Sequence, residues 1–212
     1  MSRKVASELL RVGAVFLRPR EPFTWASGIK SPVYCDNRLT LSDPEARDVI
    51  ERGIAQAVRE HFPGCEILMG TSTAGIPHAA IAAHLLRMPM GYVRGGTKDH
   101  GRQNQIEGRL APGQKAVVVE DLISTAGSAV EAVEALRQAG AEVLGIVSIF
   151  TYGMRKGLER LKAAGVTNHS LTDFDTVARE AARLGAIPET DLERLKRFRD
   201  NPQDESWIGA DR

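Results

Sequence analysis

VVVEDLISTAGSA, residues 117–129, joins a run of β-branched residues to two acidic residues and then to a turn of small side chains. The three valines predict a buried parallel strand, because a strand that is covered on both faces is apolar throughout. From Ser128 the pattern SAVEAVEALRQAG places apolar residues at helical spacing and ends in Gly140, which is typical of a helix terminus. The stretch therefore predicts a strand-to-helix crossover of an α/β protein.

The turn in this crossover predicts an anion site. Residues 125–128 carry no bulky side chain, so their backbone N–H groups can surround a phosphate at the helix N-terminus. Glu120 and Asp121 precede the turn at the carboxyl end of the strand, where open α/β sheets bind ligands. Two carboxylates beside a phosphate require hydroxyls or a cation, which a ribose phosphate and magnesium would supply. The alternative is an ordinary connection in which the acidic pair is solvated and Thr125 or Ser128 caps the helix.

Short apolar runs alternate with helical patterns along much of the chain. We expect strands at residues 66–69, 90–93, 117–119 and 143–150, and helices at residues 76–86, 128–138 and 154–164. This alternation predicts an α/β fold with a central parallel sheet flanked by helices.

Two further helices are expected nearer the N-terminus. Apolar residues recur at helical spacing over residues 2–17, which predicts one amphipathic helix. A capping box that begins at Ser42, with a proline in the first turn, predicts a second helix that runs to Phe62. We expect residues 1–200 to form one domain that includes a small N-terminal hood. Residues 201–212, with an isolated tryptophan at position 207, are expected to form a loosely ordered tail.

The composition argues against several classes of partner. Lys and Arg total 28 against 27 Asp and Glu, so the net charge of +1 provides no basic field for nucleic acid or for a membrane surface. The apolar stretch at residues 12–17 is too short for a signal or a spanning segment. Cys35 and Cys65 lack metal-type spacing and fit free thiols in a reducing compartment. We therefore expect a cytoplasmic protein.

Two loops outside the crossover are candidates for substrate contacts. Residues 95–105 (GGTKDHGRQNQ) contain no large apolar side chain, and we expect a cationic lid that closes over a pyrophosphate leaving group. The cationic side chains are those of Arg94, Lys98, His100 and Arg102. Residues 70–75 (GTSTAG) follow a strand and open a helix, which predicts a second anion site for pyrophosphate. The alternatives are a solvated hairpin tip and a plain glycine-rich turn.

These segments together resemble a known family. Residues 117–129 are similar to the phosphoribosyl pyrophosphate signature of type I phosphoribosyltransferases, in which two acidic residues precede a Thr/Ser-Gly phosphate loop. Residues 23–38 (FTWASGIKSPVYCDNR) and 92–108 (YVRGGTKDHGRQNQIEG) resemble the orotate-site segment and the mobile catalytic loop of orotate phosphoribosyltransferases. Residues 70–80 resemble the pyrophosphate loop of that family. The resemblance extends from about residue 2 to residue 186.

The resemblance implies a fold, a reaction and a set of site residues. The fold would be that of type I phosphoribosyltransferases, with an N-terminal hood. The reaction would transfer ribose 5-phosphate from phosphoribosyl pyrophosphate to orotate in pyrimidine biosynthesis, giving orotidine 5′-monophosphate and pyrophosphate. The enzyme would use Mg²⁺, without a set of metal-binding side chains of its own, and would be a homodimer with shared active sites.

Individual residues receive roles from the same resemblance. The catalytic residues would be Lys98, His100, Glu120 and Asp121. Phosphoribosyl pyrophosphate would be bound by Arg94, Lys98, His100, Glu120, Asp121, Leu122, Ile123, Ser124, Thr125, Ala126, Gly127 and Ser128. Orotate would be read by backbone atoms of Tyr34 and Cys35 and by the Ser124 hydroxyl, and we add Lys30 as a candidate partner of its carboxylate.

The chain departs from the family pattern at four places. Many members have lysine at the position of Ala26, a Tyr-Lys pair at Thr73-Ala74, lysine at Gly95, and an arginine near Tyr152 that contacts orotate. The sequence therefore does not identify all the residues that contact pyrophosphate and the base. Two alternatives also stay open: a type I enzyme for a purine or uracil, and a non-catalytic sensor of phosphoribosyl pyrophosphate that controls a DNA-binding partner.

Overall fold

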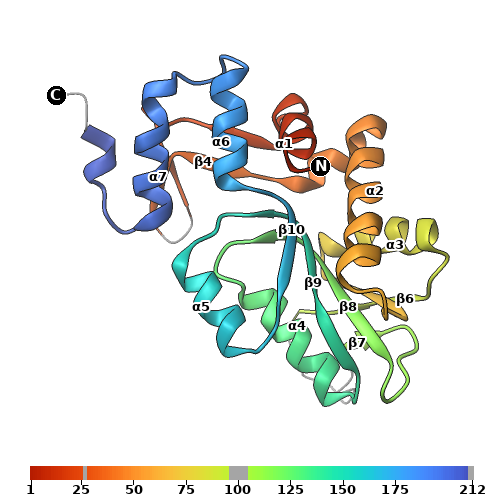
Figure 1. Ribbon diagram of the computed structural model, residues 1–212. Coiled ribbons are helices and arrows are strands. Elements are labelled where there is room, and N and C mark those ends of the chain that lie inside the picture. Colours follow the sequence, from red (N-terminus) through yellow and green to blue (C-terminus); the bar gives the residue numbers. More distant parts are fainter. Residues whose placement is uncertain (26–27, 96–104, 210–212) are drawn as a thin grey trace.

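A six-stranded sheet forms the centre of the fold (Figure 1) in the computed structural model, which describes residues 1–25, 28–95 and 105–209. In spatial order the strands are β10 (Asn168–Asp173), β9 (Glu142–Thr151), β8 (Lys115–Ile123), β5 (Ile67–Thr71), β6 (Met90–Val93) and β7 (Ile106–Glu107). All neighbouring strands are parallel except β6 and β7. The expected α/β fold is confirmed. The expected parallel sheet is mixed, because the edge strand β7 pairs with β6 in the antiparallel direction.

Helices cover both faces of this sheet (Figure 1). α2 (Pro44–His61) and α3 (Gly75–Leu86) pack on one face, and α4 (Gly127–Gln138) and α5 (Arg155–Ala163) on the other. The central strand β8 shows the cause, since Val117 and Val119 belong to the core beneath α2 and α3, whereas Ala116 and Val118 belong to the core beneath α4. Successive side chains of a strand point to opposite faces, so an apolar run suits a sheet buried on both sides.

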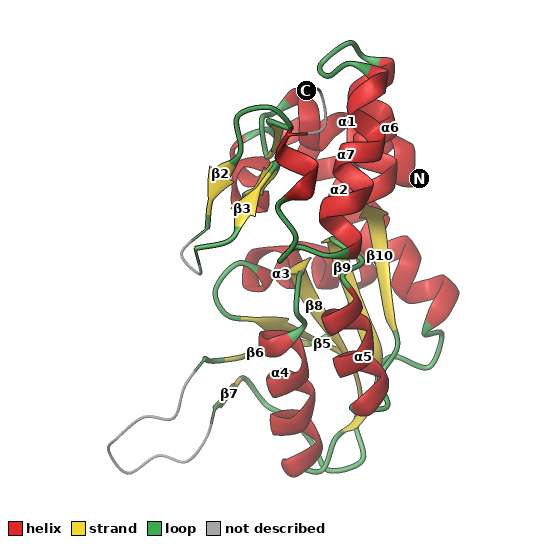
Figure 2. Ribbon diagram, turned by 90° about the vertical axis from the view of Figure 1, so that its left-hand side faces the viewer, coloured by secondary structure: helices red, strands yellow, loops and turns green. Residues whose placement is uncertain are grey.

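The hood combines both ends of the chain, as Figures 1 and 2 show. Its antiparallel strand pairs are β1 (Val15–Leu17) with β4 (Val33–Cys35) and β2 (Phe23–Thr24) with β3 (Lys30–Ser31). α1 (Ser2–Arg11), α6 (Phe174–Arg183) and α7 (Leu192–Asp200) lie beside them, so the hood is not built from N-terminal residues alone. Trp207 is not isolated: it lies in the 3-10 helix η3 (Ser206–Gly209), is 1% exposed and contacts Phe198 of α7. The domain boundary at residue 200 stays a prediction.

Two expected helix boundaries are wrong. The helix expected over residues 2–17 ends at Arg11, because Gly13 adopts a left-handed conformation (φ 68°) and the chain turns into β1. The second helix is capped by Asp43 and not by Ser42, which ends the 3-10 helix η1 (Asn37–Ser42). The Asp43 carboxylate accepts a hydrogen bond of 2.9 Å from the backbone N–H of Ala46.

The strand expected over residues 117–119 is longer at both ends. β8 includes Glu120, Asp121, Leu122 and Ile123, so the acidic pair lies within the strand, near the carboxyl end at which it was expected. Its pairing with β9 continues to Ile123. The turn before α4 is correspondingly short, and the two acidic side chains point to opposite sides of the strand.

Beyond residue 164 the chain forms β10, α6, the 3-10 helix η2 (Glu189–Asp191) and α7, none of which was predicted from the sequence patterns. Across the described parts of the chain, none of the helices has both the length and the apolar character needed to cross a membrane.

Candidate active site

The turn between β8 and α4 presents backbone N–H groups. Ser124 and Thr125 form the turn, Ala126 occupies the N-cap position, and α4 begins at Gly127. Ala126 adopts a left-handed conformation (φ 58°, ψ 21°) and has no side-chain oxygen with which to cap the helix. The first N–H groups of α4 therefore point out of the helix without an intrahelical acceptor. Together with the positive end of the helix dipole, they make this turn suitable for a phosphate.

Leu122 and Ile123 act as strand residues beneath this turn. Leu122 pairs with Phe150 of β9, and the backbone carbonyl of Ile123 accepts a hydrogen bond of 2.9 Å from the N–H of Tyr152. The Ile123 side chain is buried. These residues fix the height of the phosphate turn above the sheet.

The Glu120 carboxylate is buried between β5 and α4. Its Oε1 accepts hydrogen bonds from the Thr71 hydroxyl (2.7 Å) and from the backbone N–H of Asp121 (3.0 Å), and its Oε2 accepts one from the Ser128 hydroxyl (3.0 Å). The side chain is 4% exposed. Burial, and then the neighbouring Asp121 carboxylate, raise the pKa of Glu120 to about 8, although the two hydroxyl donors oppose this shift. Glu120 thus joins the two anion loops.

Asp121 lies on the other side of β8 and faces a cavity of about 250 Å³. This cavity is lined by Cys35, Asp36, Arg38, Thr73, Ala74 and Asp121. Residues from three distant segments, the end of β4, the loop after β5 and the end of β8, therefore surround one space. Polar and charged groups are common in it, which is typical of a site for a charged small molecule.

The segment expected to read the base is joined directly to the acidic pair. Tyr34 and Cys35 belong to β4, which pairs with β1. The Asn37 side chain then donates a hydrogen bond of 2.7 Å to the backbone carbonyl of Asp121 and accepts one of 3.3 Å from the Cys35 thiol. Burial raises the pKa of the Cys35 thiol, so the group is an uncharged side chain in this position. Asn37 was not singled out in the sequence.

The second anion loop follows β5. Thr71 is the last residue of that strand, and α3 begins at Gly75, one residue earlier than expected. The Ser72 hydroxyl accepts a hydrogen bond of 2.8 Å from the backbone N–H of Gly95, and Ser72–Thr73 is a cis peptide. Thr73 and Ala74 face the Asp121 cavity. The two expected anion loops therefore lie on adjacent strands of the sheet, on either side of the acidic pair.

Arg94 lies at the end of β6, on the side of the second loop away from Asp121. It lines a small cavity of about 40 Å³ together with Thr71, Ser72 and Ser128, and its guanidinium forms an ion pair of 3.1 Å with Glu107. Four other residues of interest lie outside the described residues: Ala26, Lys98, His100 and Arg102. Lys30, proposed as a carboxylate partner, donates instead to the Thr24 hydroxyl at 2.7 Å.

α5 supports the phosphate turn, which the sequence did not indicate. Gly157 packs so closely on the turn that a Cβ atom at this position would overlap the carbonyl oxygen of Ser124. One turn further along α5, the guanidinium of Arg160 donates a hydrogen bond of 3.1 Å to the carbonyl of Thr125. Gly157 and Arg160 are three residues apart, so their spacing places them on the same side of a helix. That this side contacts the phosphate turn is known only from the fold.

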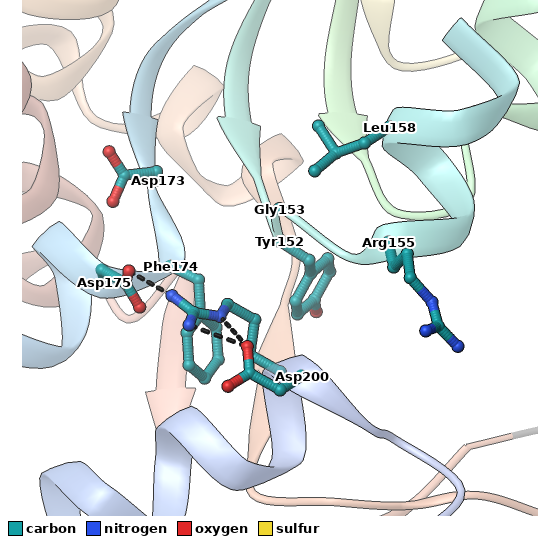
Figure 3. Close-up of a pocket in the computed structure, with 9 residues that line it drawn as sticks. Tyr152, Gly153, Arg155, Leu158, Asp173, Phe174, Asp175 and Asp200 are labelled. Carbon is teal, nitrogen blue, oxygen red and sulfur yellow. Dashed lines mark hydrogen bonds and ion pairs between the residues drawn. The ribbon is translucent and has the colours of Figure 1, made fainter. Parts of the chain in front are cut away.

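Two further cavities lie between the hood and α5. One, of about 380 Å³, extends from Trp25 and Ile29 of the hood past Thr125 to Met154. The other, of about 360 Å³, is shown in Figure 3. Arg199 also lines it and forms ion pairs with Asp175 and Asp200.

Tyr152 contributes to the wall of the second cavity (Figure 3). Its ring is buried and packs edge-on against Trp25, with 5.6 Å between the ring centroids. The side chain at position 152 is thus aromatic, and an arginine, Arg155, lines the same cavity three residues further along the chain (Figure 3). In this cavity the nearby Arg199 is already neutralised by two carboxylates.

Comparisons with known proteins agree with this architecture. The profile of the phosphoribosyl transferase domain matches residues 40–180. The chain is 55% identical, over 99% of its own length and 100% of the relative, to the orotate phosphoribosyltransferase of Bacillus cytotoxicus. Among solved structures, the orotate phosphoribosyltransferase of Aeropyrum pernix superposes with a TM-score of 0.74 and 31% identity over 86% of this chain and 99% of that chain. UMP synthase of Leishmania donovani gives a TM-score of 0.78 and 25% identity over 92% of this chain, which spans only 41% of that longer chain.

The parallel strands carry two anion loops and an acidic pair at their carboxyl ends, where α/β sheets bind ligands, and together with the matching profile this places the chain in the phosphoribosyltransferase class. The chain belongs to the orotate phosphoribosyltransferases of this class.

Proposed function

We propose that this site transfers ribose 5-phosphate from phosphoribosyl pyrophosphate to orotate, releasing pyrophosphate and forming orotidine 5′-monophosphate in pyrimidine biosynthesis. Orotate N1 forms a bond to ribose C1 while the bond from C1 to the pyrophosphate oxygen breaks. The observation that carries the proposal is the position of the acidic pair. Glu120 accepts a hydrogen bond from Ser128 at the phosphate turn, whereas Asp121 faces the second anion loop at Thr73 and is joined by Asn37 to the segment that follows β4.

The phosphate turn fits the 5′-phosphate of the substrate. Residues 124–128 provide the N-terminal N–H groups of α4, which bind an anion through hydrogen bonds and the helix dipole. The second loop, with the hydroxyl of Thr73 facing the Asp121 cavity, fits the pyrophosphate. The ribose then lies over the end of β8 between these two anions. This order of phosphate, sugar and pyrophosphate accounts for two anion sites on adjacent strands.

The acidic pair has two different roles in this proposal. Asp121 faces the cavity, so its carboxylate can accept hydrogen bonds from the ribose hydroxyls and stabilise positive charge as the bond at C1 lengthens. Glu120 is already held by Thr71 and Ser128 and acts first by fixing the two anion loops relative to each other. Its raised pKa makes it a group that can gain or lose a proton near neutral pH.

Base recognition is assigned to the hood side of the same cavity. The backbone of Tyr34 and Cys35 and the hydroxyl of Ser124 can form hydrogen bonds to a planar pyrimidine. The bond from Asn37 to Asp121 supports this assignment, because it fixes β4 beside the ribose position. Arg94, Lys98 and His100 are assigned to the pyrophosphate, over which the loop that carries the last two would close and exclude water.

The Asp121 cavity also fits magnesium. Asp36 and Asp121 supply hard oxygen donors to it, and no group of three or more metal-binding side chains occurs among the described residues. One or two carboxylates with substrate oxygens and water are the usual ligands of Mg²⁺ in nucleotide sites. When bound, the ion would neutralise charge on the pyrophosphate as it departs.

We further infer a cytoplasmic homodimer with shared active sites. Cys35 and Cys65 are both free thiols, which suits a reducing compartment. A loop as polar as residues 95–105 has little apolar surface with which to pack on its own subunit, so Lys98 and His100 are assigned to the neighbouring site.

The reaction is tested by following the loss of orotate absorbance with phosphoribosyl pyrophosphate and Mg²⁺. Orotate should be consumed with a kcat/KM at least about a hundredfold above that for uracil. Uracil lacks the carboxylate of orotate, so the polar groups of a site that binds this carboxylate would be left unpaired. If uracil, hypoxanthine or adenine were consumed with a kcat/KM comparable to that of orotate, the assignment of orotate as the acceptor would be wrong. Absence of turnover with all four bases, with tight binding of phosphoribosyl pyrophosphate, would favour a sensor instead.

A further inference from the structure

Arg38 has a place in the site that the sequence did not suggest. It lies in η1, directly after β4, and lines the Asp121 cavity opposite Thr73 and Ala74. Of the six described residues that line this cavity, Arg38 is the one with a cationic side chain. The segment that reads the base thus also brings a guanidinium to the loop assigned to pyrophosphate.

The Arg38 side chain is held in a defined position. Its Nε donates to Asp36 Oδ1 at 2.7 Å, and its Nη2 donates to Oδ2 of the same carboxylate at 2.8 Å. Asp36 also accepts the backbone N–H of Arg38 at 3.2 Å, so the pair is fixed at the start of η1. The Arg38 side chain is 65% exposed, and a guanidinium has five N–H donors, so this pairing leaves donors that can reach a ligand.

The charges around the cavity favour a cationic side chain in addition to the Mg²⁺ proposed there. Asp36 and Asp121 both face the space, and pyrophosphate would add several negative charges to it. Ala74 contributes only a methyl group, and Thr73 contributes a hydroxyl without charge. Arg94, on the far side of the loop, is paired with Glu107. A guanidinium suits phosphate oxygens particularly well, because its planar fork can bind two of them at once.

We propose that Arg38 binds the pyrophosphate group of the substrate and of the product, while Asp36 orients its guanidinium. This inference rests on the proposed function, which places pyrophosphate at residues 71–74. Binding exchanges part of the contact between Arg38 and Asp36 for contacts with phosphate oxygens. Arg38 then supplies, from the base-reading segment, the positive charge that Ala74 cannot supply from the loop.

The test measures binding of magnesium pyrophosphate by titration calorimetry, without turnover. Arg38→Ala should raise the Kd of pyrophosphate at least about tenfold, as expected for loss of a charged hydrogen bond, and Arg38→Lys should restore part of the affinity. Ribose 5-phosphate, which lacks pyrophosphate, should bind Arg38→Ala within about twofold of wild type.

Arg52→Ala is the matched control. Arg52 is 66% exposed and forms a 2.7 Å ion pair with Asp48 on α2, outside the Asp121 cavity, so its loss removes the same charge elsewhere. The Kd of pyrophosphate should not change in this variant beyond about twofold. Asp36→Asn keeps the guanidinium and should therefore raise the Kd of pyrophosphate less than Arg38→Ala does, although it removes the carboxylate that orients Arg38 and an oxygen donor to Mg²⁺.

An unchanged pyrophosphate Kd in folded Arg38→Ala would overturn the proposal, as would an equal loss in Arg52→Ala. If Arg38→Ala does not fold, Arg38→Gln keeps the hydrogen-bonding shape without the charge and decides the question in the same titration. If the wild-type protein consumes no orotate, the proposed function fails, whereas the pyrophosphate titration still decides the role of Arg38.

Discussion

Arg160 of α5 donates a hydrogen bond of 3.1 Å from its guanidinium to the backbone carbonyl of Thr125, in the turn assigned to the 5′-phosphate. Gly157, one helical turn earlier, allows α5 to touch the carbonyl of Ser124. The turn itself consists of small residues, of which Ala126 is buried and Ser124 and Thr125 are partly exposed, so its own side chains provide little packing. Its geometry therefore depends on a helix that follows it by about thirty residues.

The first prediction tests this support. Arg160→Ala should raise the KM for phosphoribosyl pyrophosphate about fivefold, because the turn loses a charge-assisted hydrogen bond and samples other conformations. The KM for orotate should change less. Arg137→Ala is the matched control, since Arg137 also donates to backbone carbonyls, at 2.7 Å to Ala164 and 3.1 Å to Gly165, away from the turn. Equal effects of the two substitutions on this KM would contradict a specific role for Arg160.

The second prediction concerns the conformation of the turn. Ala126 has φ 58°, a region that costs an L-residue about 1–2 kcal/mol and costs glycine little. Ala126→Gly relieves this strain but loses a buried methyl group, worth about 0.8 kcal/mol, and gains freedom in the unfolded chain. Ala135→Gly, in the interior of α4, should lower the free energy of unfolding by about 1 kcal/mol, because no backbone strain is relieved there. The free energy of unfolding should therefore be higher in Ala126→Gly than in Ala135→Gly by about 1 kcal/mol.

Denaturant titrations of the two variants measure this difference directly. Activity should be retained in Ala126→Gly, because glycine accepts the observed backbone angles. If both substitutions lower the free energy of unfolding equally, the left-handed conformation at position 126 does not carry the expected strain.

The elements that sequence patterns predicted are those whose signal is local. Residues 117–119 and the helix beginning near Ser128 lie in a continuous apolar run and in a regular amphipathic repeat, so each could be recognised from its own residues. β10, NHSLTD, was missed because its polar residues give a weak strand pattern, and its pairing with β9 provides what the pattern lacks. The left-handed turn at Gly13 interrupts a helical repeat that otherwise continues.

The site could be predicted as far as its residues lie in one motif. Glu120 and Asp121 were identified as a pair, but their different surroundings depend on Thr71 and Cys35, which the fold brings to β8 from elsewhere. Arg38 and Arg160 carried no local signal, because an arginine in a polar segment is most often a solvated surface residue. Their partners are known only once the strands and helices are assembled.

The third prediction follows from the pKa of Glu120. Burial raises this pKa to about 8, so at pH 7 the free protein holds a proton on Glu120 that is lost as the pH rises. If the ionised form supports the transition state, kcat/KM should rise with pH up to about 8, approaching tenfold per pH unit below it, and then level off. Glu120→Gln should have a lower kcat/KM, by at least about tenfold at pH 8.5, without this rise.

Stability should change in the opposite direction. A carboxyl group whose pKa is higher in the folded state than in the unfolded chain binds its proton more tightly when folded. The contribution of protonated Glu120 to the free energy of unfolding is therefore complete below about pH 4.5 and is lost as the pH rises through about 8. The free energy of unfolding should therefore fall between pH 5 and pH 8 in wild type and fall less in Glu120→Gln. Equal pH profiles of stability in the two proteins would show that Glu120 ionises normally.

The fourth prediction tests whether active sites are shared between subunits. Lys98→Ala and Asp121→Asn should each inactivate the enzyme, the first through the loop and the second through the cavity. If the loop of one subunit serves the site of its neighbour, a heterodimer of the two variants has one site with both defects and one with neither. Mixing them under conditions of subunit exchange should then restore up to about half of the wild-type activity per heterodimer.

Mixing Glu120→Gln with Asp121→Asn provides the matched control. Both residues lie on β8 and serve the active site of their own subunit, so every site of their heterodimer carries one defect. Activity should not return in this mixture, although mass measurement shows equal exchange. Recovery only with the Lys98→Ala partner would support a loop that acts across the dimer, because the intact site then combines the loop of one subunit with the β8 of the other. If neither mixture regains activity although heterodimers form, each loop serves its own subunit and the shared-site proposal is wrong.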